Sequence, residues 1–144
     1  MKVSNDAQAV IMRRDGDSFL FLILKRFDKD KKEDHYRLVK GGIKRDESAE
    51  RAIKREVLEE TDIHDIETIE PLCHYSYVGG DVCHEVDVFI ILSSTSDRIQ
   101  ISSEEEGGFT IKDASWMLGE DAIKKLTFED ERKLIVAALE KVTK

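Results

Sequence analysis

Three glutamates lie on one face of the clearest helix that the sequence predicts, residues 48–61. Apolar and small side chains recur through this segment at helical spacing, and Ser48 is well suited to cap its start. Glu56, Glu59 and Glu60 follow at spacings i, i+3 and i+4, which brings three carboxylates within an arc of roughly 100°. Like charges so close repel one another, so this arrangement needs a compensating positive charge.

A helical wheel relates this acidic cluster to the core. At about 100° per residue, Ala52 and Ile53 fall on the same face as the glutamates, whereas Lys54 and Leu58 point away. All three glutamates are therefore expected to point inward, where a carboxylate must be paired or must bind a metal. Hard cations such as Mg²⁺ prefer oxygen ligands and often bridge to phosphates, so the cluster indicates a magnesium site.

The rest of the chain predicts a sheet and two further helices. The expected strands are 7–14 and 19–27 around a turn at 15–17, then 37–39, 68–78, 82–93 and 109–117. Residues 28–34 are expected to be a charged loop, and helices are expected at 120–126 and 128–142. This order predicts an α/β fold, in which helices cover a mixed sheet.

Length and charge restrict the class of protein. The 144 residues fit one domain, 1–144, and the formal net charge is −8 without a concentrated basic patch. This argues against a nucleic-acid-binding domain, although an acidic protein still binds polyphosphates when a divalent cation mediates the contact. No apolar stretch approaches the roughly 18 residues of a membrane span, and residues 1–6 lack a signal peptide's apolar core. We therefore expect a cytoplasmic protein.

Two cysteines each precede a histidine, as Cys73-His74 and Cys83-His84. Their spacing matches no common zinc module, and both pairs fall in expected strands. The favoured interpretation is two reduced, mostly buried thiols, with a zinc site as the weaker alternative.

Residues 41–63 resemble the Nudix box, G-x5-E-x7-R-E-U-x-E-E-x-G-U, where U is a bulky aliphatic residue. The matching positions are Gly41, Glu47, Arg55, Glu56, Val57, Glu59, Glu60 and Ile63. Asp62 replaces the second glycine, which in this family ends the helix. Asp62 is therefore expected to adopt a left-handed conformation, unless the helix ends in another way. The order of elements also fits the family's α/β/α sandwich over the whole chain.

The resemblance implies a hydrolase that uses Mg²⁺, or Mn²⁺, to cleave a diphosphate linkage of a nucleotide. It assigns the metal site to Glu56, Glu59 and Glu60, with Glu47 in support and a backbone carbonyl at Lys40 or Gly41 as a further ligand. Catalytic roles are expected for Glu59, Glu56 and Arg55. The general base is either a box glutamate or an acid in a later loop, where Glu104, Glu105 and Glu106 are the candidates and Glu105 is preferred.

The substrate is less constrained by the sequence. Residues 37–43 resemble the segment that opens the box in diadenosine polyphosphate hydrolases and RNA 5′-pyrophosphohydrolases, and residues 116–134 resemble the diadenosine polyphosphate branch. A dinucleoside polyphosphate is therefore the preferred substrate. Nucleoside triphosphates, ADP-ribose or nucleotide sugars, an RNA 5′ end, and an inactive nucleotide-binding domain remain alternatives, and a homodimer is possible. Expected phosphate contacts are Lys25, Arg26, Arg37 and Lys40, and expected base contacts are Tyr75, Tyr77 and Phe109.

Overall fold

The computed structural model describes residues 1–95, 99–101 and 109–143. The strands are β1 (Lys2–Asp15), β2 (Ser18–Asp28), β3 (Glu33–Arg37), β4 (Val39–Gly42), β5 (Ile66–Gly79), β6 (Val82–Ser93) and β7 (Phe109–Leu118). The helices are α1 (Ala49–Thr61), α2 (Gly119–Lys125) and α3 (Glu129–Val142). The expected α/β fold is confirmed, with every predicted helix present and most strands longer than predicted.

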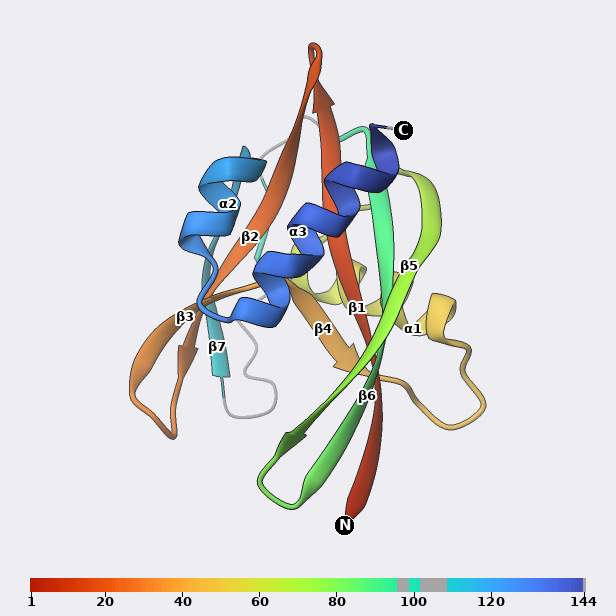
Figure 1. Ribbon diagram of the computed structural model, residues 1–144, viewed down its shortest axis with the longest axis vertical. Helices are drawn as coiled ribbons and strands as arrows, with labels where there is room; N and C mark the ends of the chain where they lie inside the picture. The colour runs from red at the N-terminus through yellow and green to blue at the C-terminus, as the bar shows by residue number, and fades with distance from the viewer. Residues whose placement is uncertain (96–98, 102–108, 144) are drawn as a thin grey trace.

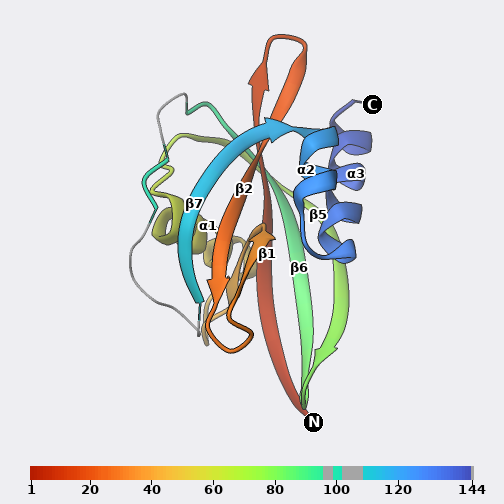
Figure 2. The ribbon, with the colours of Figure 1, turned by 90° about the vertical axis from the view of Figure 1, so that its left-hand side faces the viewer.

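Seven strands form one mixed sheet between two helical layers (Figures 1 and 2). The strand order is β3-β2-β1-β6-β5, with β4 added to β1 and β7 added to β2. Among the strand pairs that the described residues form, β1–β6 alone is parallel. Figure 2 shows α1 on one side of the sheet and α2 and α3 on the other. Each side has its own hydrophobic cluster, because successive side chains of a strand point to opposite faces.

The first two strands begin as a hairpin and then diverge. Gly16, with φ of +61°, makes the tight turn, and β1 pairs with β2 only over the residues nearest to it. Farther from the turn, β3 pairs with β2 while β4 pairs with β1. The β3–β4 segment therefore fills a fork between β1 and β2, and Leu38 lies at the point where it passes from one strand to the other.

This fork explains two differences from the sequence-based expectations. The charged segment 28–34 is a loop only at its centre, because β2 continues to Asp28 and β3 starts at Glu33. The single short strand expected at 37–39 is instead a break between two strands, because the segment changes its pairing partner at Leu38.

The two cysteines lie on neighbouring strands β5 and β6, but they are not buried. Cys73 is exposed and Cys83 is partly exposed, so the expectation of mostly buried thiols is wrong. His74 lies between the carboxylates of Glu85 and Asp87, at 2.6 and 2.8 Å, and these hydrogen bonds raise its pKa. Within the described ranges, the helices are too short or too polar to cross a membrane.

Candidate active site

Helix α1 carries the acidic cluster, and Ser48 and Asp62 define its two ends. Ser48 caps the start, where its hydroxyl accepts a hydrogen bond from the Arg51 N–H at 3.2 Å. Asp62 ends the helix in the left-handed conformation, with φ of 59° and ψ of 24°, and its N–H donates to the Leu58 carbonyl at 2.9 Å. Asp62 therefore takes the backbone conformation for which the box normally uses glycine.

The three glutamates do not share one environment. Glu56 and Glu60 are buried, at 3% and 2% exposure, as the helical wheel predicts. The Glu59 side chain is 46% exposed, so the expectation that all three point into the fold is wrong for this residue. The Glu59 carboxylate is therefore accessible to solvent.

Arg55 connects the acidic helix to the preceding loop. Its guanidinium donates two hydrogen bonds of 2.9 Å to the Glu47 carboxylate, one of 2.6 Å to Glu56 and one of 2.9 Å to the Gly42 carbonyl. The hydrogen bonds from Arg55, together with the Lys44 N–H, lower the pKa of Glu47 to about 2. The same contact with Glu47, with help from Glu56, raises the pKa of Arg55. Arg55 thus fixes the carboxylates on both sides of it and provides the compensating charge that the cluster needs.

Gly41 brings the backbone of β4 against the Glu56 carboxylate. A Cβ at this position would overlap the carboxyl carbon and both oxygens of Glu56, whereas a Cβ at Gly42 would meet nothing within 4 Å. Glycine at position 41 therefore creates the space that the Glu56 carboxylate occupies.

Glu60 is held from β2, on its other side, by a buried arginine. Arg26 is 5% exposed and its Nη2 lies 2.9 Å from Glu60 Oε1 and 3.4 Å from the Leu38 carbonyl oxygen. The Phe109 ring lies 4.2 Å from the Arg26 guanidinium carbon. Burial lowers the pKa of Arg26, although the Glu60 charge acts in the opposite direction. Arg26, an expected phosphate contact, thus lies buried between Glu60 and the ring of Phe109, an expected base contact.

The donor set of α1 has the chemistry of a hard-cation site. Glu56, Glu59 and Glu60 offer carboxylate oxygens within one and a half turns, and the backbone of Gly41 lies against the Glu56 carboxylate. In the described part of the chain, no three His, Cys, Asp or Glu side chains are already arranged to hold a metal ion. The carboxylates of Glu56 and Glu60 accept hydrogen bonds from Arg55 and Arg26, at 2.6 and 2.9 Å.

Four of the expected substrate contacts gather on the opposite face of the sheet, which is the face covered by α3. A pocket of about 190 Å³ is lined by Arg37, Tyr75, Tyr77, Phe128, Asp130 and Glu131. Lys40 adjoins it through contacts with the Tyr77 hydroxyl and ring and with Asp6, at 3.5 Å. Lys25, on β2, does not line this pocket, and its Nζ lies 3.7 Å from the Asp34 carboxylate. The base candidates Glu104, Glu105 and Glu106 fall outside the described residues.

Three residues of this pocket, Phe128, Asp130 and Glu131, were not identified from the sequence as site residues. Phe128 stacks on Arg37, with 4.6 Å between the guanidinium carbon and the ring centroid, and Glu131 is 1% exposed. A signal for Glu131 was available, because it precedes the apolar residues Leu134 and Ile135 at i+3 and i+4. A helical wheel of residues 128–142 therefore places Glu131 on the apolar face, as the wheel of 48–61 does for Glu56 and Glu60.

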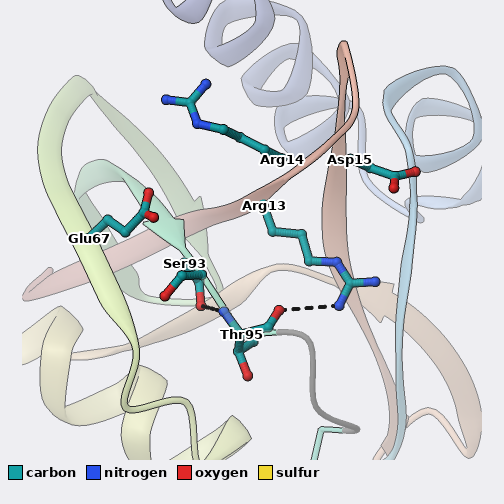
Figure 3. A pocket seen from close by; sticks show the side chains of 7 residues that line it. Arg13, Arg14, Asp15, Glu67, Ser93 and Thr95 are labelled. Atoms are coloured by element: carbon teal, nitrogen blue, oxygen red, sulfur yellow. Dashed lines mark hydrogen bonds between the residues drawn. The ribbon is translucent and has the colours of Figure 1, made fainter.

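A second cavity, of about 360 Å³, lies near the β1–β2 turn and is lined by Arg13, Arg14, Asp15, Glu67, Ser93, Ser94 and Thr95. Figure 3 shows the side chains of Arg13 and Arg14 leaving β1 in different directions, with Arg13 donating to the Thr95 carbonyl at 3.3 Å. Arg13 also stacks on Trp116, at 4.6 Å. The guanidinium groups of Arg13 and Arg14 therefore point to different places.

Comparisons with known proteins agree with this geometry. The profile of the NUDIX domain matches residues 4–139. No match is found among the curated proteins. Among solved structures, the Caenorhabditis elegans Ap4A hydrolase in a binary complex is 23% identical with a TM-score of 0.76, covering 97% of this chain and 98% of its own.

Two further solved structures share the fold at lower identity. The NUDIX domain of Shewanella oneidensis NrtR, complexed with ADP ribose, is 20% identical with a TM-score of 0.78, covering 99% of this chain and 90% of its own. The Escherichia coli dihydroneopterin triphosphate pyrophosphohydrolase is 17% identical with a TM-score of 0.69, covering 94% and 95%. The profile match spans nearly the whole chain and includes the box on α1, so this chain belongs to the Nudix family of hydrolases that act on pyrophosphate bonds.

Proposed function

We propose that this protein is a Mg²⁺-dependent pyrophosphohydrolase whose preferred substrate is a dinucleoside polyphosphate. The observation that carries the proposal is the position of β4. Its adjacent residues Lys40 and Gly41 point to opposite faces of the sheet, Gly41 toward Glu56 and Lys40 toward the aromatic pocket. A nucleotide whose base enters the pocket would reach the glutamates with its phosphates by crossing this short strand.

In this proposal, the glutamates of α1 bind the metal, and Glu59 is also the candidate general base. Glu56, Glu59 and Glu60 would hold the metal, which when bound neutralises phosphate charge and lowers the pKa of water. Arg55 keeps Glu56 and Glu47 in place through the hydrogen bonds described above. Glu59 is solvent-accessible and lies 3.5 Å from Arg55, so its carboxylate is the box glutamate best placed to accept a proton from attacking water. Glu105 remains the proposed alternative base.

The pocket on the α3 face would bind the nucleoside part of the substrate. Tyr75, Tyr77 and Phe128 supply aromatic surface, on which a planar base stacks favourably. Arg37 and Lys40 supply positive charge at the side nearest to β4, where the first phosphates would pass. The C. elegans Ap4A hydrolase, whose fold this chain shares, supports a dinucleoside polyphosphate as the first substrate to test.

The test is a hydrolysis panel in Mg²⁺ that compares dinucleoside polyphosphates, nucleoside triphosphates, ADP-ribose, nucleotide sugars and triphosphorylated RNA. We expect the highest kcat/KM for a dinucleoside polyphosphate and loss of activity in excess EDTA. Glu59→Gln should lower kcat at least about 100-fold without changing stability, because it removes a ligand or base from an exposed position. Glu50→Gln, an exposed change in the first turn of the same helix, is the matched control.

Three outcomes would contradict parts of this proposal. A higher kcat/KM for ADP-ribose or a nucleoside triphosphate would replace the substrate assignment. Nucleotide binding without turnover of any panel member would indicate a Nudix-fold binding domain. A folded Glu59→Gln protein with near-normal turnover would remove Glu59 from the catalytic site.

A further inference from the structure

Glu131 is a buried carboxylate that the box chemistry does not use. It projects from the first turn of α3 and is 1% exposed. Its Oε2 accepts hydrogen bonds from Gln8 Nε2 at 2.8 Å and from the Leu38 N–H at 2.9 Å, and its Oε1 accepts one from Arg37 Nε at 2.5 Å. A carboxylate this deeply buried is destabilising unless its oxygens are satisfied, and here three donors satisfy them.

The three donors come from segments far apart in the chain. Gln8 lies on β1, Arg37 ends β3, and Leu38 is the residue at which the β3–β4 segment changes its pairing partner. Because Leu38 lies between two strands, Glu131 supplies a side-chain acceptor for its N–H where the segment changes partner. Glu131 thereby fixes the path of the backbone immediately before Lys40 and Gly41.

The network continues from Glu131 into the wall of the pocket. Gln8 donates through Nε2 to Glu131, and its Oε1 accepts the Tyr75 hydroxyl at 2.6 Å. Burial, with a contribution from the Glu131 charge, raises the pKa of Tyr75, so this hydroxyl keeps the proton that it donates. On the other side, Arg37 is held by Glu131 while it stacks on Phe128. Glu131 therefore orients groups on two walls of one pocket.

We infer that Glu131 is the positioning residue for nucleoside recognition: its carboxylate sets the pocket geometry through Arg37, Leu38 and the Gln8–Tyr75 pair. The inference rests on the proposed function, because it assumes that the pocket binds the nucleoside part of the substrate. Glu131 acts through these neighbours and has no part in phosphate chemistry, which takes place on the other face of the sheet.

The test compares Glu131→Gln and Gln8→Met with Glu129→Gln. Glu131→Gln keeps the size of the side chain but turns an NH₂ group toward donors, so it breaks the network. Gln8→Met removes the link to Tyr75 from a residue that does not line the pocket. Glu129→Gln is the matched control, because Glu129 is in the same turn, its side chain is 66% exposed, and it pairs only with Arg132 among the contacts described.

Four quantities are measured on each folded variant: KM, kcat, the Kd of ADP by calorimetry, and the Kd of Mn²⁺ without nucleotide. In Glu131→Gln, KM and the ADP Kd should rise about tenfold, because a tenfold loss of affinity is the size expected when one hydrogen bond to a charged group is lost. Gln8→Met should give a smaller rise in the same two quantities. In both variants kcat should stay within about twofold and the Mn²⁺ Kd should not change, because α1 is untouched.

Wild-type KM and ADP Kd in a folded Glu131→Gln protein would overturn the inference, as would a fall in kcat at constant KM. If Glu131→Gln does not fold, the ADP Kd of Gln8→Met tests the inference instead. An unchanged ADP Kd in that variant overturns the inference. If the wild-type protein hydrolyses no nucleotide, the proposed function fails while the ADP affinities still test Glu131. Absence of ADP binding by the wild-type protein would overturn the inference, whereas the hydrolysis panel decides the proposed function separately.

Discussion

At the scale of single residues, Gly41 and Glu56 pack closely in the candidate active site. The Glu56 carboxylate occupies the volume that any other side chain at position 41 would need. Arg55 holds the same carboxylate from the other side, at 2.6 Å. Glu56 is therefore held from two sides, which helps to orient it as a ligand.

Gly41→Ala should displace Glu56 and reduce kcat/KM by about 100-fold, the effect of a misplacement of the order of 1 Å. The same overlap should lower the free energy of unfolding by about 1–3 kcal/mol. Steady-state kinetics and urea unfolding measure the two effects. Gly42→Ala is the matched control, because a Cβ there meets nothing within 4 Å. Equal activities of the two variants would show that the Gly41–Glu56 packing has no role.

At the scale of secondary-structure elements, the C-terminal end of α1 shows how the chain accommodates a departure from the box. Asp62 is in the left-handed region at φ of 59°, and its side chain lies 3.2 Å from His64. Its negative charge also lies at the helix C-terminus, where the helix dipole disfavours an anion. Asp62 therefore gives the helix the same C-terminal backbone conformation as glycine, but it stabilises this position less than glycine would.

Variants at position 62 should rank in stability as Gly, then Asp, then Ala. Glycine adopts the left-handed conformation without steric cost, whereas alanine lacks the local hydrogen bond that helps aspartate, so the Gly–Ala difference should be about 1 kcal/mol. Thermal unfolding measures the order. An Asp62→Ala protein as stable as Asp62→Gly would show that this end of the helix does not depend on backbone conformation.

At the scale of the whole molecule, the crossing at Leu38 is held from both faces of the sheet. On the α1 face, Arg26 donates to the Leu38 carbonyl and to Glu60. On the α3 face, Glu131 accepts the Leu38 N–H. Leu38, between β3 and β4, is thus linked through Arg26 to Glu60 on the acidic helix and through Glu131 to the pocket. The chain continues from Leu38 into β4, which carries Lys40 and Gly41.

Arg26→Met should destabilise the protein by about 3 kcal/mol or more, because it leaves the buried Glu60 carboxylate without the charge that compensates it. The double variant Arg26→Met/Glu60→Leu should recover much of this loss, because an apolar pair of similar volume needs no charge compensation. Urea unfolding of both proteins gives the comparison. A single variant that loses less than about 1 kcal/mol would contradict the assignment of Arg26 as the partner of Glu60.

Much of the architecture follows from short-range patterns. The hairpin around Gly16, the Ser48 cap and the inward position of Glu56 were all predictable, because turn residues, caps and helical periodicity act over a few positions. Asp62 was expected to be left-handed for the same reason. The motif on 41–63 is equally local, and it was sufficient to indicate the family.

The sequence by itself determined the three helices, most of the strands, the inward position of Glu56 and Glu60, and the family, since all of these depend on neighbours along the chain. Only the tertiary structure decided that β3 and β4 fill the fork between β1 and β2, and which face each side chain meets there. It separated Arg26, which faces Glu60, from Arg37 and Lys40, which lie by the pocket. It also joined Glu131 to Gln8 across 123 positions, because strand pairing and register, rather than distance along the chain, determine which buried charges meet.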